Sequence, residues 1–234
     1  MLARATGKYL VQHVYERVAG CPGVGRVIVA TDSGEVVEAC RSFGAEVALT
    51  SPEHASGTDR VAEVARSLAE EIVVNVQGDE PLIRHEDIER LLELFRSGSP
   101  EGRAPRADMT TLCVERRDAE GFRDPNIVKV VFGRDGRALY FSRSPVPYAD
   151  PAAPAGRGAP WYQHVGIYGY RREALLEIAR LEPTALEKRE RLEQLRALEG
   201  GFAIRVGVTT ARHAGIDTEE QYRAFVAEYL EGRV

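Results

Sequence analysis

IVVNVQGDEP, residues 72–81, decides the fold of this chain. Its first six residues form a nearly continuous apolar run, as do strands that are buried on both faces of a parallel sheet. Gly78 and Pro81 then stop the strand abruptly. The segment therefore predicts a buried strand that ends in an acidic turn.

Helical and strand patterns alternate on both sides of this segment. Helices are predicted at 9–18, 35–43, 61–68 and 86–95, and strands at 26–32, 46–50 and 109–114. The Gly- and Pro-rich composition of residues 97–105 predicts a loop. The alternation indicates an α/β fold with a Rossmann-like, mostly parallel sheet.

The second half of the chain departs from this alternation. Residues 126–142, NIVKVVFGRDGRALYFS, read as two strands joined by an Arg-Asp-Gly turn, which predicts an antiparallel insertion. A loop at 145–160 follows. The remaining pattern predicts strands at 161–170 and 203–208 and helices at 186–199 and 219–230. We expect one domain over 1–234.

Composition narrows the class of protein. With 234 residues, 44% hydrophobic and 29% charged, the chain can bury a substantial core, and its net charge of -5 provides no basic field for nucleic acid. Three widely spaced cysteines suggest buried free thiols. No apolar run has the length of a membrane span, and the start lacks the apolar core of a secretory signal. We expect a cytoplasmic protein.

Two carboxylates occupy positions where α/β proteins bind ligands. Asp79 follows the 72–77 strand and Asp217 follows the 203–208 strand, and ligands bind outside the carboxyl ends of such strands. If they converge, they would form a magnesium site. The alternative is that each caps the helix after it, and spacing alone favours the caps.

Other polar residues allow two interpretations each. In the loop 54–60, HASGTDR, the residues Ser56, Gly57, Thr58 and Arg60 suit a ribose or phosphate. An ordinary helix cap with a surface arginine is the more usual explanation of such a loop. His164 lies in an apolar strand, where a hydrogen-bonded core histidine is the commoner case. The charged run 186–193 and Gln194 read as a solvated helix face. These residues alone do not identify the reaction that the protein catalyses.

Nine motifs together resemble a known family. They are QHVYER at Gln12, IVATD at Ile28, SGTDR at Ser56, VNVQGDEP at Val74, PNIVKVV at Pro125, LYFSR at Leu139, HVGIYGYR at His164, LEQLR at Leu192 and GIDT at Gly215. In this order they resemble the 3-deoxy-manno-octulosonate cytidylyltransferases (CMP-Kdo synthetases), which have the nucleotide-diphospho-sugar transferase fold. The resemblance covers essentially the whole chain.

The resemblance implies a reaction, a cofactor and a set of site residues. CMP would pass from CTP to 3-deoxy-D-manno-octulosonate (Kdo), giving CMP-Kdo and pyrophosphate for lipopolysaccharide biosynthesis. Catalysis would use Mg²⁺ held by Asp79 and Asp217. Nucleotide-binding residues would be Ser56, Gly57, Arg60 and Gln77. Sugar-binding residues would be Arg143, His164, Tyr168, Glu193 and Gln194.

The resemblance also implies an oligomeric state and a difference at the N-terminus. A homodimer through about 125–170 is implied, with no nucleic-acid partner and no membrane insertion. Members of the family begin with a strand and a phosphate-binding loop. By the resemblance, Met1 of this sequence corresponds to a position just after that loop. Two alternatives stay open: a cytidylyltransferase for another acidic sugar (amino-Kdo or sialic acid), or a truncated, low-activity nucleotide-binding relative. HVGIYGYR and LEQLR favour Kdo.

Overall fold

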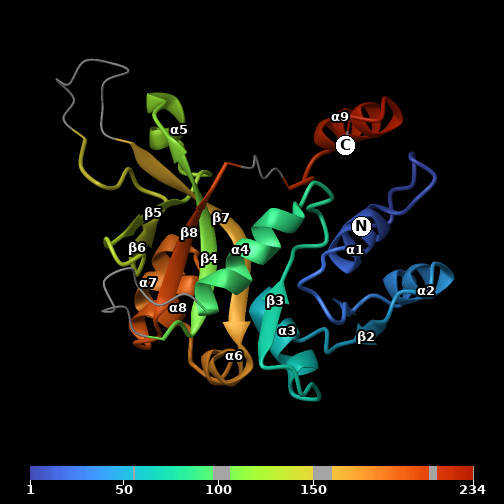
Figure 1. Cartoon of the computed structure of the whole chain (residues 1–234), viewed down its shortest axis with the longest axis horizontal. Coiled ribbons are helices and arrows are strands. Elements are labelled where there is room, and N and C mark those ends of the chain that lie inside the picture. The colour runs from blue at the N-terminus through green and yellow to red at the C-terminus, as the bar shows by residue number, and fades with distance from the viewer. Residues whose placement is uncertain (55, 97–105, 150–159, 211–214, 234) are drawn as a thin grey trace. The chain divides into compact units, whose positions relative to one another are not determined.

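The computed structural model describes residues 1–54, 56–96, 106–149, 160–210 and 215–233. The predicted loop at 97–105 and most of the loop at 145–160 lie outside these residues. Contacts divide the chain into two compact units, and Figure 1 labels most of their elements. Unit 1 comprises 1–68, 76–89 and 212–234, and unit 2 comprises 69–75 and 90–211.

Unit 1 contains a small parallel sheet with its helices. Its elements are α1 (Leu10–Ala19), β1 (Val29–Thr31), α2 (Gly34–Ser42), β2 (Val47–Leu49), α3 (Gly57–Ala65) and α9 (Glu219–Leu230). β1 and β2 pair in parallel, with Val29 opposite Val47, so α2 forms the predicted crossover between them. Val11 of α1 and Cys40 of α2 belong to one buried cluster, which holds these helices together.

Unit 2 contains the larger sheet. Its strands are β3 (Ile72–Asn75), β4 (Met109–Arg116), β5 (Lys129–Phe132), β6 (Ala138–Ser142), β7 (Trp161–Arg171) and β8 (Ile204–Thr209). Its helices are α5 (Ala119–Arg123), α6 (Arg172–Ile178), α7 (Ala185–Glu190) and α8 (Gln194–Glu199), and α4 (His85–Arg96) begins in unit 1 and continues into unit 2. None of the helices in the described ranges is long and apolar enough to span a bilayer.

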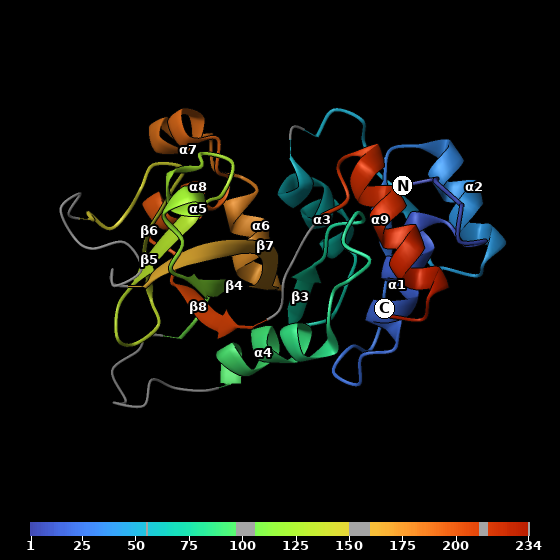
Figure 2. The same cartoon turned by 90° about the horizontal axis from the view of Figure 1, so that it is seen from above.

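The long strand β7 organises the larger sheet. β4 runs antiparallel along one edge of β7, and β5 and β3 pair with the opposite edge, near its start and its end (Figure 2). β8 is parallel to β4, and β6 is antiparallel to β5. Thus β3, β4, β5 and β8 share one direction and β6 and β7 take the other. Most of the described strands of this sheet therefore run in one direction, as the sequence predicts, and β5 and β6 form the predicted antiparallel hairpin. Among the described pairings of this sheet only β4–β8 is parallel, because β7 runs against its three neighbours.

The prediction that the 72–77 strand is buried on both faces is wrong. Residues 72–74 are only half-buried, and Asn75 is the buried residue of β3. Among the described strands β3 pairs with β7 alone, so it is an edge strand. A continuous apolar run therefore did not distinguish an edge position from a central one.

The predicted helix at 186–199 is two helices. α7 ends where Arg191 adopts the left-handed conformation (φ 54°), and α8 begins at Gln194. The Arg143 side chain donates hydrogen bonds to the main-chain carbonyls of Glu190, at 2.8 Å, and Arg191, at 3.4 Å. These bonds take carbonyls that would otherwise accept helical N–H groups, which stabilises the break.

The reversal between α7 and α8 is closed by a buried ion pair, so the run 186–193 is not simply a solvated face. Arg196 Nε and Nη2 donate to the two carboxylate oxygens of Glu187 at 2.8 and 2.6 Å. Their side chains are only 8% and 10% exposed. Burial alone would raise the pKa of Glu187, but the Arg196 guanidinium holds it below its ordinary value.

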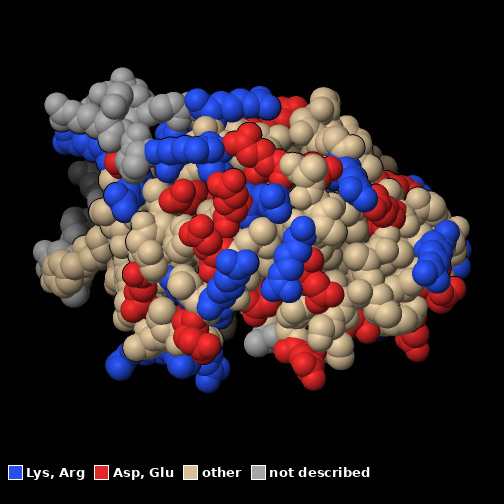
Figure 3. Space-filling model, turned by 90° about the horizontal axis from the view of Figure 1, so that it is seen from below, with Lys and Arg blue, Asp and Glu red and all other residues tan. Residues whose placement is uncertain are grey.

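Charged side chains of both signs lie on the face of the molecule drawn in Figure 3. On the face in Figure 3, lysine and arginine side chains are interspersed with aspartate and glutamate side chains. Exposed ion pairs elsewhere in the described structure include Arg223 with Glu219 on α9 and Arg41 with Glu38 on α2. Such pairs favour solubility more than stability.

Candidate active site

The structure brings Asp79 and Asp217 together. Asp79 lies in the turn after β3, and its carbonyl accepts a hydrogen bond from the Ile216 N–H at 2.8 Å. This bond fixes residues 215–217 against the turn. A Cβ atom at Gly215 would lie 3.7 Å from Asp79 Oδ2 and 4.0 Å from Asp217 Oδ2. Both carboxylates therefore border the same glycine.

Helix capping does not explain either carboxylate. The cap of α9 is Thr218, whose hydroxyl accepts the Gln221 N–H at 3.2 Å. The Gln221 side chain accepts the N–H groups of Thr218 and Asp217, each at 2.8 Å. Asp79 lies in a turn that ends before α4 begins. The alternative that these two residues are caps is therefore wrong.

The electrostatics of the pair suit a divalent cation. Burial raises the pKa of Asp79, and the neighbouring negative charge of Asp217 raises it further. A cation would relieve this repulsion, and carboxylate oxygens are ligands that Mg²⁺ prefers. Within the described ranges no group of three or more His, Cys, Asp or Glu residues could hold a metal. The donor set thus fits an ion that completes its shell with water and substrate oxygens.

Residues 56–60 form the start of α3, which begins four residues earlier than predicted. Ser56 is its cap and accepts the Asp59 N–H at 3.1 Å. Gly57 faces open space, since a Cβ atom there would have no neighbour within 4 Å. The interpretation of Ser56 as an ordinary helix cap is therefore correct.

Arg60 links the ends of β1 and β2. Its guanidinium donates to Asp32 Oδ2 at 2.8 Å and to Thr50 Oγ1 at 2.6 Å. Asp32 and Thr50 directly follow the two strands, so Arg60 lies at the carboxyl edge of the small sheet. Asp32 was missed as a candidate, although the rule that selected Asp79 applies to it equally. Gln77 is exposed, in the turn that contains Asp79.

His164 is a buried, neutral residue of β7. Its Nε2 lies 2.9 Å from Thr111 Oγ1, and that hydroxyl also lies 2.9 Å from the Ile167 carbonyl. Carbonyls only accept, so the Thr111 proton goes to Ile167 and His164 Nε2 must donate; Nδ1 is then left as an acceptor. Burial lowers the pKa of His164 to about 3.

The other sugar-side candidates divide between β7 and the α7–α8 junction. The Tyr168 ring centroid lies 5.5 Å from that of His164. Arg143 donates to the carbonyls of the junction, where Glu193 is exposed. Gln194 is not part of a solvated face, since it is 5% exposed, and its buried Nε2 has no hydrogen-bond partner in the described structure.

We predict that His164→Gln reduces the loss of stability on acidification. In the folded chain His164 stays neutral down to about pH 3, whereas in the unfolded chain it takes up a proton below 6.5. The unfolded state thus binds more protons as the pH falls, and stability falls with it. Between pH 7 and pH 5 this single group accounts for roughly 2 kcal/mol. Urea unfolding at both pH values measures it; identical pH dependence in parent and variant would contradict the burial.

Comparison with known proteins agrees with this fold. The profile of a family described as "Cytidylyltransferase" matches residues 1–205. A 3-deoxy-manno-octulosonate cytidylyltransferase from Geobacter sulfurreducens is 47% identical over 225 residues, 93% of this chain and 87% of that protein. A solved structure of CMP:2-keto-3-deoxy-manno-octonic acid synthetase complexed with CTP is 40% identical, with a TM-score of 0.88 over 99% of this chain and 91% of that one.

A more distant structure shares the fold alone. It is 4-diphosphocytidyl-2C-methyl-D-erythritol synthase from Anaerococcus prevotii, 11% identical, with a TM-score of 0.59 over 96% of this chain and 90% of that one. The fold and these similarities define an α/β nucleotidyltransferase. More particularly, the chain belongs to the cytidylyltransferase family. The resemblance inferred from the sequence motifs is confirmed.

Proposed function

We propose that this chain transfers CMP from CTP to Kdo and releases pyrophosphate. The similarity to 3-deoxy-manno-octulosonate cytidylyltransferases over 93% of the chain carries this proposal. The paired carboxylates of Asp79 and Asp217 agree with it, since transfer from a triphosphate requires charge neutralisation near the phosphates.

The reaction makes and breaks one bond to phosphorus. The anomeric hydroxyl of the sugar attacks the α-phosphorus of CTP in line, loses its proton, and forms the new P–O bond as the bond to pyrophosphate breaks. Asp79 and Asp217 would hold Mg²⁺, which when bound neutralises phosphate charge and lowers the pKa of a nearby hydroxyl. Ser56, Gly57, Arg60 and Gln77 of unit 1 would contact the nucleotide.

The sugar-side residues supply complementary hydrogen-bonding groups. Neutral His164 offers Nδ1 as an acceptor for a sugar hydroxyl, and Tyr168 lies beside its ring. Gln194 Nε2 is a buried donor that a sugar oxygen would satisfy. Arg143 is fixed by main-chain carbonyls, so its remaining N–H groups are preorganised for the substrate carboxylate, and Glu193 would bind hydroxyls.

Pyrophosphate release with defined substrates tests the proposal. With Mg²⁺ and Kdo, we expect CTP to be preferred over ATP and GTP by at least about tenfold in kcat/KM, a difference of about 1.4 kcal/mol in transition-state binding. With CTP, we expect Kdo to be preferred over sialic acid. Equal use of purine nucleotides, or a preference for sialic acid, would contradict the assignment.

The proposed setting is a homodimer in the cytoplasm that supplies CMP-Kdo for lipopolysaccharide biosynthesis. Within 125–170, Leu139 is 62% and Tyr148 is 85% exposed, which supports this segment as the interface. Three buried free cysteines suit a reducing compartment. A monomeric mass in sedimentation at assay concentration would contradict the dimer.

A further inference from the structure

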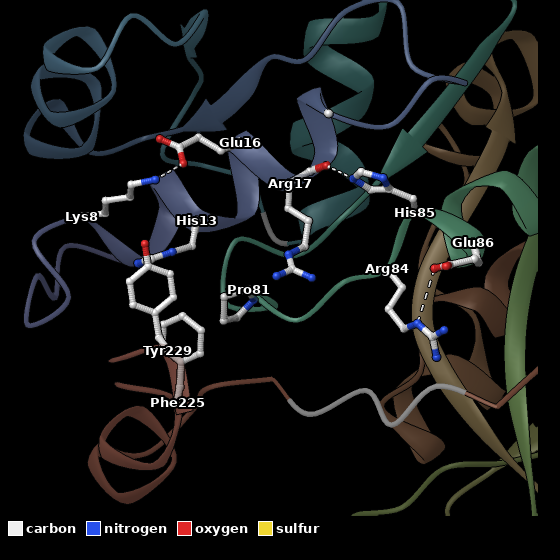
Figure 4. A pocket seen from close by; sticks show the side chains of 11 residues that line it. Lys8, His13, Glu16, Arg17, Pro81, Arg84, His85, Glu86, Phe225 and Tyr229 are labelled. Carbon is white, nitrogen blue, oxygen red and sulfur yellow. Dashed lines mark hydrogen bonds and ion pairs between the residues drawn. The ribbon is translucent and has the colours of Figure 1, made fainter. Parts of the chain in front are cut away.

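Unit 1 contains a pocket between α1, the segment 81–86 and α9, with a volume of ≈ 590 Å³ (Figure 4). It is lined by Lys8, His13, Glu16, Arg17, Gly20, Pro81, Arg84, His85, Glu86, Phe225 and Tyr229. Neither Asp79 nor Asp217 is among these residues. The pocket is therefore separate from the carboxylate pair.

The pocket contains one uncompensated positive charge. Lys8 Nζ pairs with Glu16 Oε2 at 2.5 Å, and Arg84 Nε pairs with Glu86 Oε2 at 3.4 Å. The guanidinium of Arg17 has no hydrogen-bond or ion-pair partner in the parts of the chain that the structure describes. Arg17 thus presents its full set of N–H donors to the pocket, as Figure 4 shows.

The main chain and its neighbours fix the base of the Arg17 side chain. The Arg17 carbonyl lies 2.8 Å from His85 Nε2, which links α1 to the start of α4. On the other side, Gly20 lies against the His85 ring, since a Cβ atom there would lie 3.5 Å from His85 Nε2. α1 and the segment that carries Arg84 are therefore held together at the pocket.

Aromatic rings form the opposite wall. The His13 ring packs edge-on against Phe225 and Tyr229 of α9, with centroids 5.1 and 4.6 Å away, and His13 Nε2 bonds to Thr6 Oγ1 at 2.6 Å. Burial, reinforced by the charge of Lys8, lowers the pKa of His13. A neutral, ring-lined wall lowers the local dielectric and strengthens the attraction between Arg17 and an anion.

We propose that this pocket binds a small phosphate-bearing anion through Arg17. A guanidinium fork contacts two phosphate oxygens, and the positive charges of Lys8 and Arg84, which line the same pocket, add to the attraction. The exposed pairs made by Lys8 and Arg84 are worth little, so both side chains can exchange their carboxylates for the ligand. A tetrahedral phosphate dianion has more oxygen atoms and more negative charge than a carboxylate, so it can interact with three basic groups at once.

Titration of inorganic phosphate into the full chain tests this site. EDTA is included, so that no divalent metal can bring phosphate to the Asp79–Asp217 pair. By calorimetry, we expect Arg17→Gln to weaken phosphate binding by at least about tenfold and Arg17→Lys to weaken it less, because lysine keeps the charge without the fork. Arg223→Gln is the matched control, since Arg223 is exposed on α9 and pairs with Glu219; its affinity should equal that of the parent.

A second variant and a competitor make the test decisive. Arg84→Gln, on a different segment, should weaken phosphate binding several-fold, and this variant provides the test if Arg17→Gln does not fold. Malonate should bind more weakly than phosphate. Unchanged phosphate affinity in the variants, or tighter binding of malonate than of phosphate, would overturn the proposal.

Discussion

Asp79→Asn is expected to lower kcat by a factor on the order of 10³, the scale of losses when a group that stabilises transition-state charge is removed. The amide keeps the size of the side chain but removes the charge that the phosphates' counterion requires. The fold should survive, because burial and Asp217 already disfavour the ionised carboxylate. Pyrophosphate release and the thermal midpoint measure both effects.

Two further variants test whether the loss of activity arises at the carboxylate pair. Asp217→Asn should raise the Mg²⁺ concentration needed for half-maximal rate or abolish turnover, since the ion loses one of few protein oxygens. Asp135→Asn is the control: Asp135 Oδ1 accepts the Arg137 N–H in a hairpin turn, which asparagine can also do. Turnover by Asp79→Asn at the parent rate would remove Asp79 from the site.

Arg196→Met is expected to destabilise the chain by about 3 to 5 kcal/mol, the cost of leaving one member of a buried ion pair unpaired. Glu187 would keep its charge beside α8 without the guanidinium that lowers its pKa. Glu187→Gln/Arg196→Met should recover part of the loss, because the amide can still accept the Thr184 N–H of the capping box. Urea unfolding at pH 7 gives the three free energies.

The pH dependence of stability distinguishes the loss of the ion pair from a loss of side-chain packing. In the parent, the depressed pKa of Glu187 contributes stability that is present above the unfolded-state pKa near 4.5 and is lost as the pH falls through the folded-state value. In Arg196→Met, acidification instead neutralises an unpaired buried charge. The difference between parent and variant should therefore narrow at low pH. A loss below about 1 kcal/mol, typical of an exposed pair, would contradict the buried pairing.

Local signals explain which elements the sequence could predict. The bounds of α9 are as expected, because Thr218 and Gln221 form a capping box directly before the helical pattern. The β5–β6 hairpin follows from the Gly136 turn, which has φ 79°. The break at Arg191 carries no Gly or Pro, and the side chain that stabilises it, Arg143, comes from a distant part of the chain.

The site was predictable where strand ends expose polar residues. Asp79 and Asp217 were candidates for that reason, but only the Ile216–Asp79 hydrogen bond shows that they meet. Burial was harder to anticipate, since Gln194 and Glu187 lie in a run of charges that is typical of an exposed helix face. Arg17 belongs to the QHVYER motif but was not chosen as a candidate, because an arginine on an amphipathic helix usually faces solvent.

The fate of label from CTP tests the proposed reaction most directly. The chain is incubated with Kdo, Mg²⁺ and CTP that carries ³²P at either the α or the γ position. If the chain transfers CMP to the sugar, α-label appears in a CMP-sugar and γ-label in pyrophosphate, in equal amounts and only when Kdo is present. Label that stays in CTP, or γ-label released as inorganic phosphate without a CMP-sugar, would contradict the reaction.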